Sequence, residues 1–172
     1  MPQCYLCKSF FKVHPMKSIF LSIALTVSTL ISWSQTTTNL TWYTDVSLAS
    51  QAAATENKPM LLFFTGSDWC GWCHRLQREV FNTPAFTTWA SSDVILVELD
   101  FPRNKVLPQN IKEQNQLLQQ QFGVQGYPTV WFVNVSKVED KFNLAPLNST
   151  GYLQGGPDVW ITNAKSILNG GK

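Results

Sequence analysis

The chain has 172 residues, of which 44% are apolar, and this suits one compact domain whose core needs no metal or disulfide staple. Its formal net charge is +2. Lysines near the N-terminus carry this excess, and residues 35–172 hold one more acidic than basic group, so the charge gives no case for nucleic-acid binding.

The first 34 residues are predicted to be an export signal. Lys17 precedes an apolar stretch over residues 19–33, and Ser32-Trp33-Ser34 places small residues at both positions that determine cleavage. We therefore expect the mature chain to begin near Gln35, in an exported protein of the periplasm or another extracytoplasmic space. If the segment is not cleaved, it tethers the domain to the membrane.

Residues 1–15 are unusual for a signal, and we interpret them as an upstream extension that results from the choice of start codon. Cys4 and Cys7 lie in this extension and form a C-x-x-C pair. No amphipathic helical pattern follows them. We therefore assign these two cysteines no chemistry.

After the signal, residues 35–57 form a polar lead and a predicted helix from Asp45 to Glu56, with Asp45 as its N-cap. Residues 58–170 then alternate between strands and helices, which indicates an α/β domain. Because the first predicted strand, helix and second strand follow in that order, the two strands should be parallel. Strands are expected over residues 60–65, 94–100, 130–135 and 141–151, and helices over 71–81, 110–122 and 157–168, with a short helical piece from Thr83.

Two cysteines, Cys70 and Cys73, follow the first predicted strand after a short polar turn. The amphipathic stretch beyond them places Cys70 at the start of a helix. There the unpaired backbone N–H groups and the helix dipole stabilise a thiolate, which is the form that attacks disulfides. The context therefore predicts a redox-active dithiol.

Three other interpretations of the same residues stay open. Cys70-Gly71-Trp72-Cys73-His74 also fits the C-x-x-C-H signature of c-type haem attachment, although the other histidine, His14, lies in the segment expected to be removed. A tetrahedral zinc site would need two further ligands, and a purely structural disulfide with this short gap would constrain the unfolded chain little. We expect neither a cofactor nor a metal.

The chain resembles the thioredoxin-like superfamily over about residues 40–170. The resemblance rests on Trp69-Cys70-Gly71-Trp72-Cys73 after a strand, Gly126-Tyr127-Pro128-Thr129 at the opening of another, and a final helix. Lys58-Pro59 and Glu79-Val80-Phe81 look most like the exported branch related to the C-terminal domain of the thiol-reductant transporter DsbD. The resemblance implies a thioredoxin fold, with a central mixed sheet of about four to five strands flanked by helices.

The resemblance also implies a substrate groove beside the dithiol. In this superfamily the proline at the position of Pro128 is cis and leaves the preceding backbone free to pair with a substrate strand. The groove residues carried over in this way are Trp69, Gly71, Trp72, Tyr127, Pro128 and Thr129.

Thiol chemistry then assigns Cys70 as the nucleophile and Cys73 as the resolving cysteine. His74, as a cation, is a candidate for lowering a thiol pKa, and a solvated position on the helix face is the alternative. Thioredoxins usually carry a buried Asp where this chain has Phe64. Proton transfer must then use water or another acid, and the candidates are Glu98 and Asp68, neither of which is preferred.

Two functions compete. The first is an exported thiol-disulfide oxidoreductase, a monomer that reduces or isomerises protein disulfides and is recharged by a membrane thiol-reductant donor. The second is a dedicated redox or metal-delivery partner in cytochrome or copper-site maturation, without general reductase activity.

Overall fold

The computed structural model describes residues 39–139 and 141–170. The predicted signal, its cleavage site before Gln35, and Cys4 and Cys7 lie outside these residues. From residue 39 onward the described chain forms one unit, to which the first strand and helix belong. None of the helices described is both long and apolar enough to cross a membrane.

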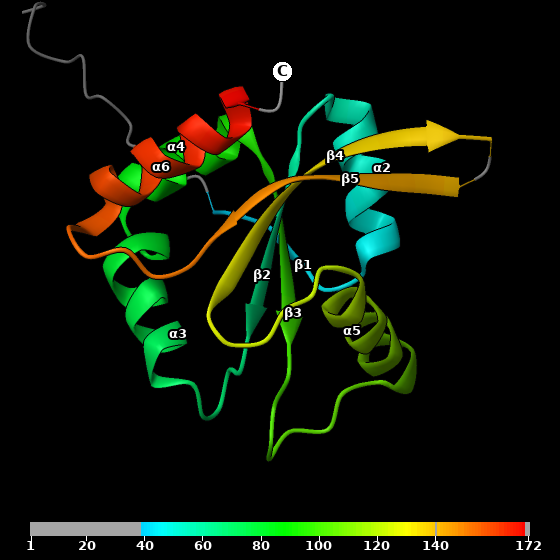
Figure 1. Cartoon of the computed structure of the whole chain (residues 1–172), viewed down its shortest axis with the longest axis horizontal. Coiled ribbons are helices and arrows are strands. Elements are labelled where there is room, and N and C mark those ends of the chain that lie inside the picture. Colours follow the sequence, from blue (N-terminus) through cyan, green and yellow to red (C-terminus); the bar gives the residue numbers. More distant parts are fainter. Residues whose placement is uncertain (1–38, 140, 171–172) are drawn as a thin grey trace, which may run out of the picture. The chain divides into compact units, whose positions relative to one another are not determined.

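A mixed five-stranded sheet forms the centre of this unit, in the order β1-β3-β2-β4-β5. β2 pairs in parallel with β3, as predicted, while β4 runs antiparallel to both β2 and β5 (Figure 1). The edge strand β1, which has two residues and pairs with β3, was not predicted. The strands are β1 (Trp42–Tyr43), β2 (Met60–Thr65), β3 (Ile95–Asp100), β4 (Thr129–Val138) and β5 (Lys141–Thr150).

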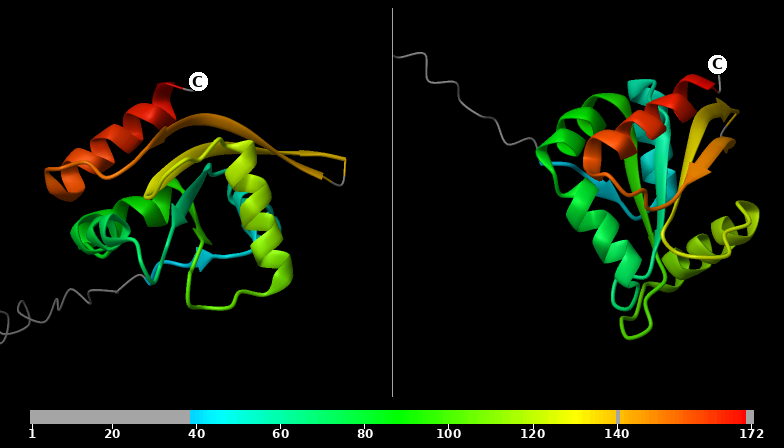
Figure 2. Two further views of the ribbon diagram at one scale, coloured as in Figure 1. Left: turned by 60° about the horizontal axis from the view of Figure 1, so that its bottom comes forward. Right: turned by 60° about the vertical axis from the view of Figure 1, so that its left-hand side comes forward.

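Helices cover both faces of the sheet, which confirms the predicted thioredoxin fold (Figure 2). One face is covered by α2 (Val46–Glu56) and α5 (Gln109–Gln121), whose apolar residues share a core cluster. The other is covered by α3 (Gly71–Leu76), the π-helix η2 (Gln77–Phe81), α4 (Pro84–Asp93) and α6 (Gly156–Gly170).

The central strand β2 is buried along its whole length and divides the core into two. Its side chains alternate between the faces of the sheet. Leu61 and Phe63 pack in the cluster that includes both cysteines, whereas Leu62 and Phe64 pack in the cluster beneath α2 and α5. The apolar run that predicted a buried strand therefore supplies both halves of the core.

The helix predicted over residues 71–81 is present over that whole span, but it changes type within it. It widens after Leu76 into η2, where the Asn82 N–H donates to the Gln77 carbonyl at 2.8 Å. A π-turn carries residue i+5 back over residue i, whereas an α-helix would turn it away. Leu76 and Phe81, five residues apart, are both buried as a result.

The predicted cap at Asp45 is confirmed, and the edge of the sheet shows a feature that was not predicted. Asp45 caps α2, because its carboxylate accepts from the N–H groups of Ser47 and Leu48 at 2.8 and 3.2 Å. At the edge strand β5, Pro146 stands opposite Val133, beside an irregularity in the β4–β5 pairing. The first feature fixes where α2 begins, and the second marks the outer edge of the sheet.

Candidate functional site

Cys70 and Cys73 form a disulfide at the N-terminus of α3, with their Cα atoms 5.2 Å apart. Cys70 is the N-cap of the helix, and its Sγ accepts from the Cys73 N–H at 3.2 Å. The Cys70 N–H donates to the Gly66 carbonyl at 2.9 Å, which sets the turn between β2 and α3. Cys70 is 5% exposed and Cys73 is fully buried. Both residues are therefore buried, and Cys70 is the more exposed of the two.

The Tyr127–Pro128 peptide is cis and precedes β4. The Tyr127 ring meets the Trp69 ring edge-on, with centroids 5.7 Å apart. Its hydroxyl accepts from Gln119 Nε2 at 2.7 Å, and burial raises the pKa of Tyr127. The Thr129 hydroxyl donates back to the Gly126 carbonyl at 2.8 Å. The predicted groove residues Trp69 and Tyr127 thus pack against each other.

Trp69, the residue before Cys70, is held by both main-chain and side-chain groups. Its indole N–H donates to the Phe101 carbonyl at 2.8 Å, and the ring lies against Gly66. A side chain at position 66 would overlap the indole. The Arg103 guanidinium lies over the indole, 4.1 Å from the centroid of the Trp69 ring. We call this arrangement the Trp69 flank.

Asp68 links the same turn to the loop between β3 and α5. Its carboxylate accepts from the N–H groups of Arg103 and Asn104 at 3.0 and 2.7 Å. These bonds, with Arg103 first, lower the pKa of Asp68. A carboxylate occupied in this way by backbone donors is poorly suited to take a proton from Cys73.

Ser67 is the centre of a polar cluster on this turn. Its N–H and hydroxyl donate to Asp100 at 2.8 and 2.6 Å, and Lys105 Nζ donates to its hydroxyl at 3.1 Å. The exposed His74 ring lies with Nε2 at 2.8 Å from the Ser67 carbonyl. Because a carbonyl only accepts, Nε2 carries the proton in this contact. His74 therefore supports the turn through Ser67.

Trp72, between the cysteines, is 55% exposed and is contacted by the side chains of Tyr152 and Arg75. Its ring lies 5.4 Å from that of Tyr152, and the Arg75 guanidinium lies 5.3 and 4.9 Å from the two centroids. Arg75 Nε and the Tyr152 hydroxyl donate to the two oxygens of Glu79 at 2.8 and 2.5 Å. We call Arg75, Glu79 and Tyr152 the Trp72 clamp.

Sequence reasoning gave the clamp no role. Glu79 entered only as part of a flanking motif, although Arg75 and Glu79 have the i,i+4 spacing of a helical ion pair. Tyr152 is 73 residues from Glu79, and no sequence pattern joins them. The bond to Tyr152 and then that to Arg75 lower the pKa of Glu79, while the bond to Glu79 raises the pKa of Tyr152.

Phe64 and Glu98 lie on opposite faces of the sheet. Phe64 packs against Phe101 and Phe122, with centroids 6.4 and 6.3 Å apart. Glu98 pairs with Phe63 on β2 and so faces the side covered by α3. Burial raises the pKa of Glu98, and the charge of Asp100 adds to this effect. Asp68 and Glu98 are the two carboxylates considered for proton transfer. Of these, Glu98 has the raised pKa, and it faces the dithiol's side of the sheet.

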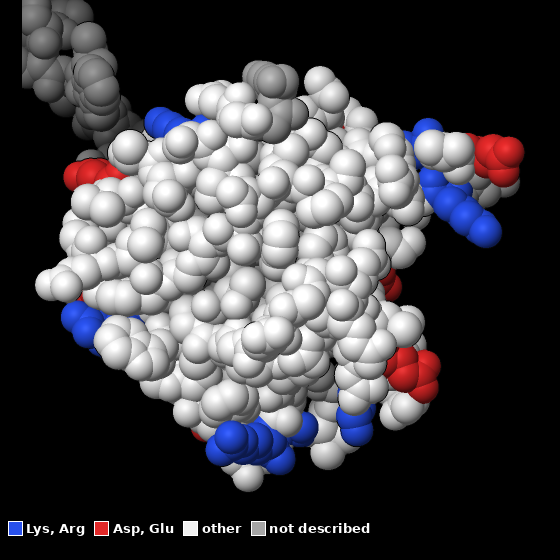
Figure 3. Space-filling model, in the orientation of Figure 1, with Lys and Arg blue, Asp and Glu red and all other residues white. Residues whose placement is uncertain are grey.

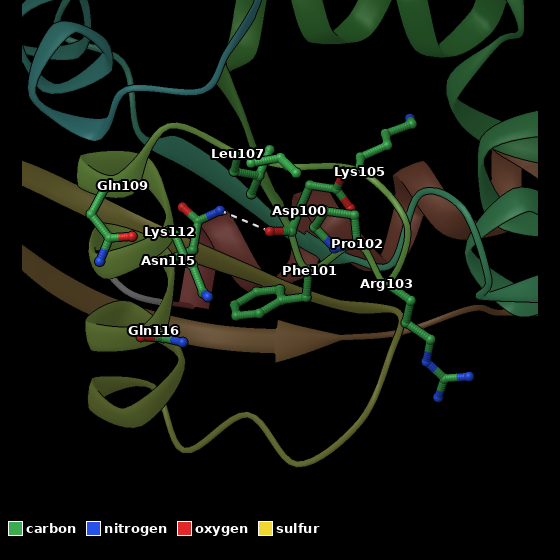
Figure 4. Close-up of a pocket in the computed structure, with 11 residues that line it drawn as sticks. Asp100, Phe101, Pro102, Arg103, Lys105, Leu107, Gln109, Lys112, Asn115 and Gln116 are labelled. Carbon is green, nitrogen blue, oxygen red and sulfur yellow. Dashed lines mark hydrogen bonds between the residues drawn. The ribbon is translucent and has the colours of Figure 1, made fainter.

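A cavity of about 380 Å³ lies beside the Trp69 flank, between the β3–α5 loop and α5. Phe101 points toward α5, while Arg103 points away from it (Figure 4). Asn115 closes the inner wall by donating to the Asp100 carbonyl at 2.9 Å.

Across residues 39–139 and 141–170, no three His, Cys, Asp or Glu side chains converge closely enough to hold a metal ion.

The family described as Thioredoxin-like matches residues 41–134. The chain is 32% identical over 130 residues to the disulfide bond reductase DsbH of Chlamydia pneumoniae, covering 76% of this chain and 74% of that protein. A solved structure of DsbH oxidoreductase shares 33% identity with a TM-score of 0.67 over 76% of this chain and 85% of that one. A second relative in Chlamydia pneumoniae, the thioredoxin-related protein DsbJ, is 28% identical, and the chain spans 37% of it.

Proposed function

This chain belongs to the thioredoxin-like family and is a thiol-disulfide oxidoreductase, and from that premise we propose that it reduces or isomerises protein disulfides through Cys70 and Cys73. The observation that carries the proposal is Cys70 at the N-cap of α3, with the Cys73 N–H aimed at its sulfur. That donor and the helix dipole favour a Cys70 thiolate in the reduced protein. The similarity to a protein named a disulfide bond reductase favours reduction over oxidation.

In the proposed reaction the Cys70 thiolate attacks one sulfur of a partner disulfide. The partner S–S bond breaks, its other sulfur leaves and takes up a proton, and a mixed disulfide forms. Cys73, as a thiolate, then attacks Cys70 Sγ and releases the second partner sulfur, which is also protonated. Two electrons pass to the partner, and the Cys70–Cys73 disulfide, the state seen here, remains.

The groove residues take supporting roles in this proposal. With Pro128 cis, the backbone at Tyr127 pairs with an extended segment of the partner. Trp69, Gly71, Trp72 and Thr129 line the approach to Cys70. His74 steadies the turn through its contact with the Ser67 carbonyl. No cofactor beyond the dithiol itself takes part.

We also propose an export setting, in which the predicted signal over residues 1–34 precedes a single domain that takes in β1 and α2. In an oxidising compartment a reductase must be recharged, so a membrane thiol-reductant donor is required. The protein acts as a monomer. The alternative remains a dedicated redox or metal-delivery partner in cytochrome or copper-site maturation.

The deciding experiment measures the reduction potential of Cys70–Cys73 in the chain from Gln35, by Trp fluorescence against a dithiothreitol series, together with insulin reduction. We expect a potential near that of thioredoxin, about −270 mV, whereas a value near about −120 mV would make the protein a dithiol oxidase. Cys70→Ser should abolish insulin reduction, and Cys73→Ser should trap the mixed disulfide. A low potential without insulin reduction would favour the dedicated partner.

A further inference from the structure

Trp72 is an unusual residue to leave in solvent. It lies between the two cysteines and is 55% exposed, more than most of the other large apolar side chains of the described chain. Trp and Tyr side chains at the centre of protein interfaces supply much of the binding energy. An exposed indole two residues after Cys70 is therefore placed to contact whatever Cys70 attacks.

The Trp72 clamp fixes this indole without burying it. α3 supplies Arg75, η2 supplies Glu79, and the segment after β5 supplies Tyr152. Both oxygens of Glu79 are used, one by Arg75 Nε at 2.8 Å and one by the Tyr152 hydroxyl at 2.5 Å. The guanidinium and the Tyr152 ring then pack against Trp72. The bonds from Glu79 thus hold in place the two side chains that pack against the exposed Trp72 ring.

The charges in the clamp indicate what kind of group this surface accepts. Glu79 offsets the charge of Arg75 directly and lies 3.8 Å from Arg78. The surface here carries the exposed Trp72 indole with the Tyr152 ring next to it, beside the guanidinium of Arg75, whose charge Glu79 offsets. Such a surface gains most from an apolar or aromatic side chain, through removal of apolar area from water and ring packing.

We infer that Arg75, Glu79 and Tyr152 are positioning residues that hold Trp72 as a contact surface for an apolar side chain next to the partner's reacting cysteine. This inference rests on the proposed function and deepens it, because it names a chemical preference of the same site. The clamp touches neither sulfur. Its loss should therefore change partner binding and leave thiol chemistry intact.

The test uses two disulfide-bridged peptides that are identical except for leucine or serine beside the reacting cysteine. The wild-type chain should show a lower KM for the leucine peptide. Glu79→Gln and Tyr152→Phe keep the size of each side chain, and each should raise that KM about two- to tenfold, the range of one aromatic contact. The kcat and the rate with glutathione disulfide should stay within twofold of the wild-type values. The reduction potential should be unchanged.

Matched controls are Glu113→Gln on α5, whose carboxylate accepts from Gln109, and Tyr43→Phe on β1. Neither should alter the leucine preference. A second readout is the Trp72 fluorescence anisotropy, taken as the difference from Trp72→Phe, which should fall in the clamp variants. Equal KM values for both peptides in the wild type, or clamp variants that leave KM and anisotropy unchanged, would overturn the inference.

Failure of the proposed function would look different. If the wild-type chain reduces neither peptide nor glutathione disulfide, the reductase proposal fails. Binding of the two peptides to the oxidised chain, followed by Trp72 fluorescence, then decides the inference by itself. Tighter binding of the leucine peptide, weakened by Tyr152→Phe, supports the clamp, and equal binding of both peptides refutes it.

Discussion

Two tryptophans lie next to the cysteines in the sequence, Trp69 before Cys70 and Trp72 before Cys73, and they are held by different contacts. Trp69 is partly buried and bonded to a main-chain carbonyl, over a glycine that leaves room for its ring. Trp72 is mostly exposed and is held by side chains alone. The Trp69 flank is therefore part of the fold, whereas Trp72 and the Trp72 clamp can change through substitutions that leave the fold intact.

The largest contrast should come from the same substitution on each flank. Trp69→Ala removes a packed ring and its hydrogen bond and should lower the free energy of unfolding by about 2–4 kcal/mol, somewhat less than for a fully buried tryptophan. Trp72→Ala should cost less than about 0.5–1 kcal/mol, as for a surface site. Urea denaturation of the oxidised protein measures both. Equal losses would remove the distinction between the flanks.

A second contrast uses the two glycines beside these rings. Gly66→Ala would place a methyl group inside the Trp69 indole, so the ring must shift, at about 1–3 kcal/mol for overpacking. Gly71→Ala has open space and should stay within about 0.5 kcal/mol. Thermal unfolding compares the pair, with near-ultraviolet circular dichroism to follow the indole. If the Gly66 variant unfolded like the wild type, Trp69 would not be tightly seated.

Low pH should affect the contacts of Trp72 and those of Trp69 differently. The pKa of Glu79 is lowered from 4.5, so its contacts are fully present above that ordinary value and are lost as the pH falls through the lower folded pKa. Trp72 fluorescence should change in that window. The Trp69 indole N–H is bonded to a carbonyl that does not titrate, but the neighbouring Asp68 also has a lowered pKa and holds the Arg103 loop. In an Asp68→Asn background, which removes that carboxylate, the Trp69 signal should therefore stay constant. Difference spectra with Trp72→Phe and Trp69→Phe resolve the two, and simultaneous changes would contradict the comparison.

The smallest effect concerns Glu98, which belongs to neither flank. Its pKa is raised from 4.5, mainly by burial, so ionisation opposes folding and stability falls as the pH rises from about 4.5 through the folded pKa. Glu98→Gln should remove this loss and unfold at a slightly higher temperature than the wild type at pH 7, with little difference near pH 4. A variant less stable at pH 7 would show that the carboxylate has a stabilising partner.

Much of the fold follows from patterns within single segments. The apolar run of β2 and the turn before β4 predicted strands, and the amphipathic stretch after the cysteines predicted that Cys70 lies at a helix start. β1 was not predicted because two residues are too few to show the alternation of apolar and polar side chains that marks a strand. Their pairing with β3 makes them a strand. The π-turn escaped because α- and π-spacing cannot be told apart over one turn. Tyr152 reaches Glu79 only after the chain has folded.

Basic and acidic side chains are sparse on the face shown in Figure 3 and gather toward its rim, including the end of the β4–β5 hairpin. The outer edge of this sheet is β5, ten residues long, and an open strand of that length invites pairing with a second copy. Pro146 has no N–H to offer such a neighbour, and the irregular pairing opposite it bends the ribbon. Lys137 and Lys141 add charge near its end. These features guard a concentrated solution of the protein against edge-to-edge aggregation.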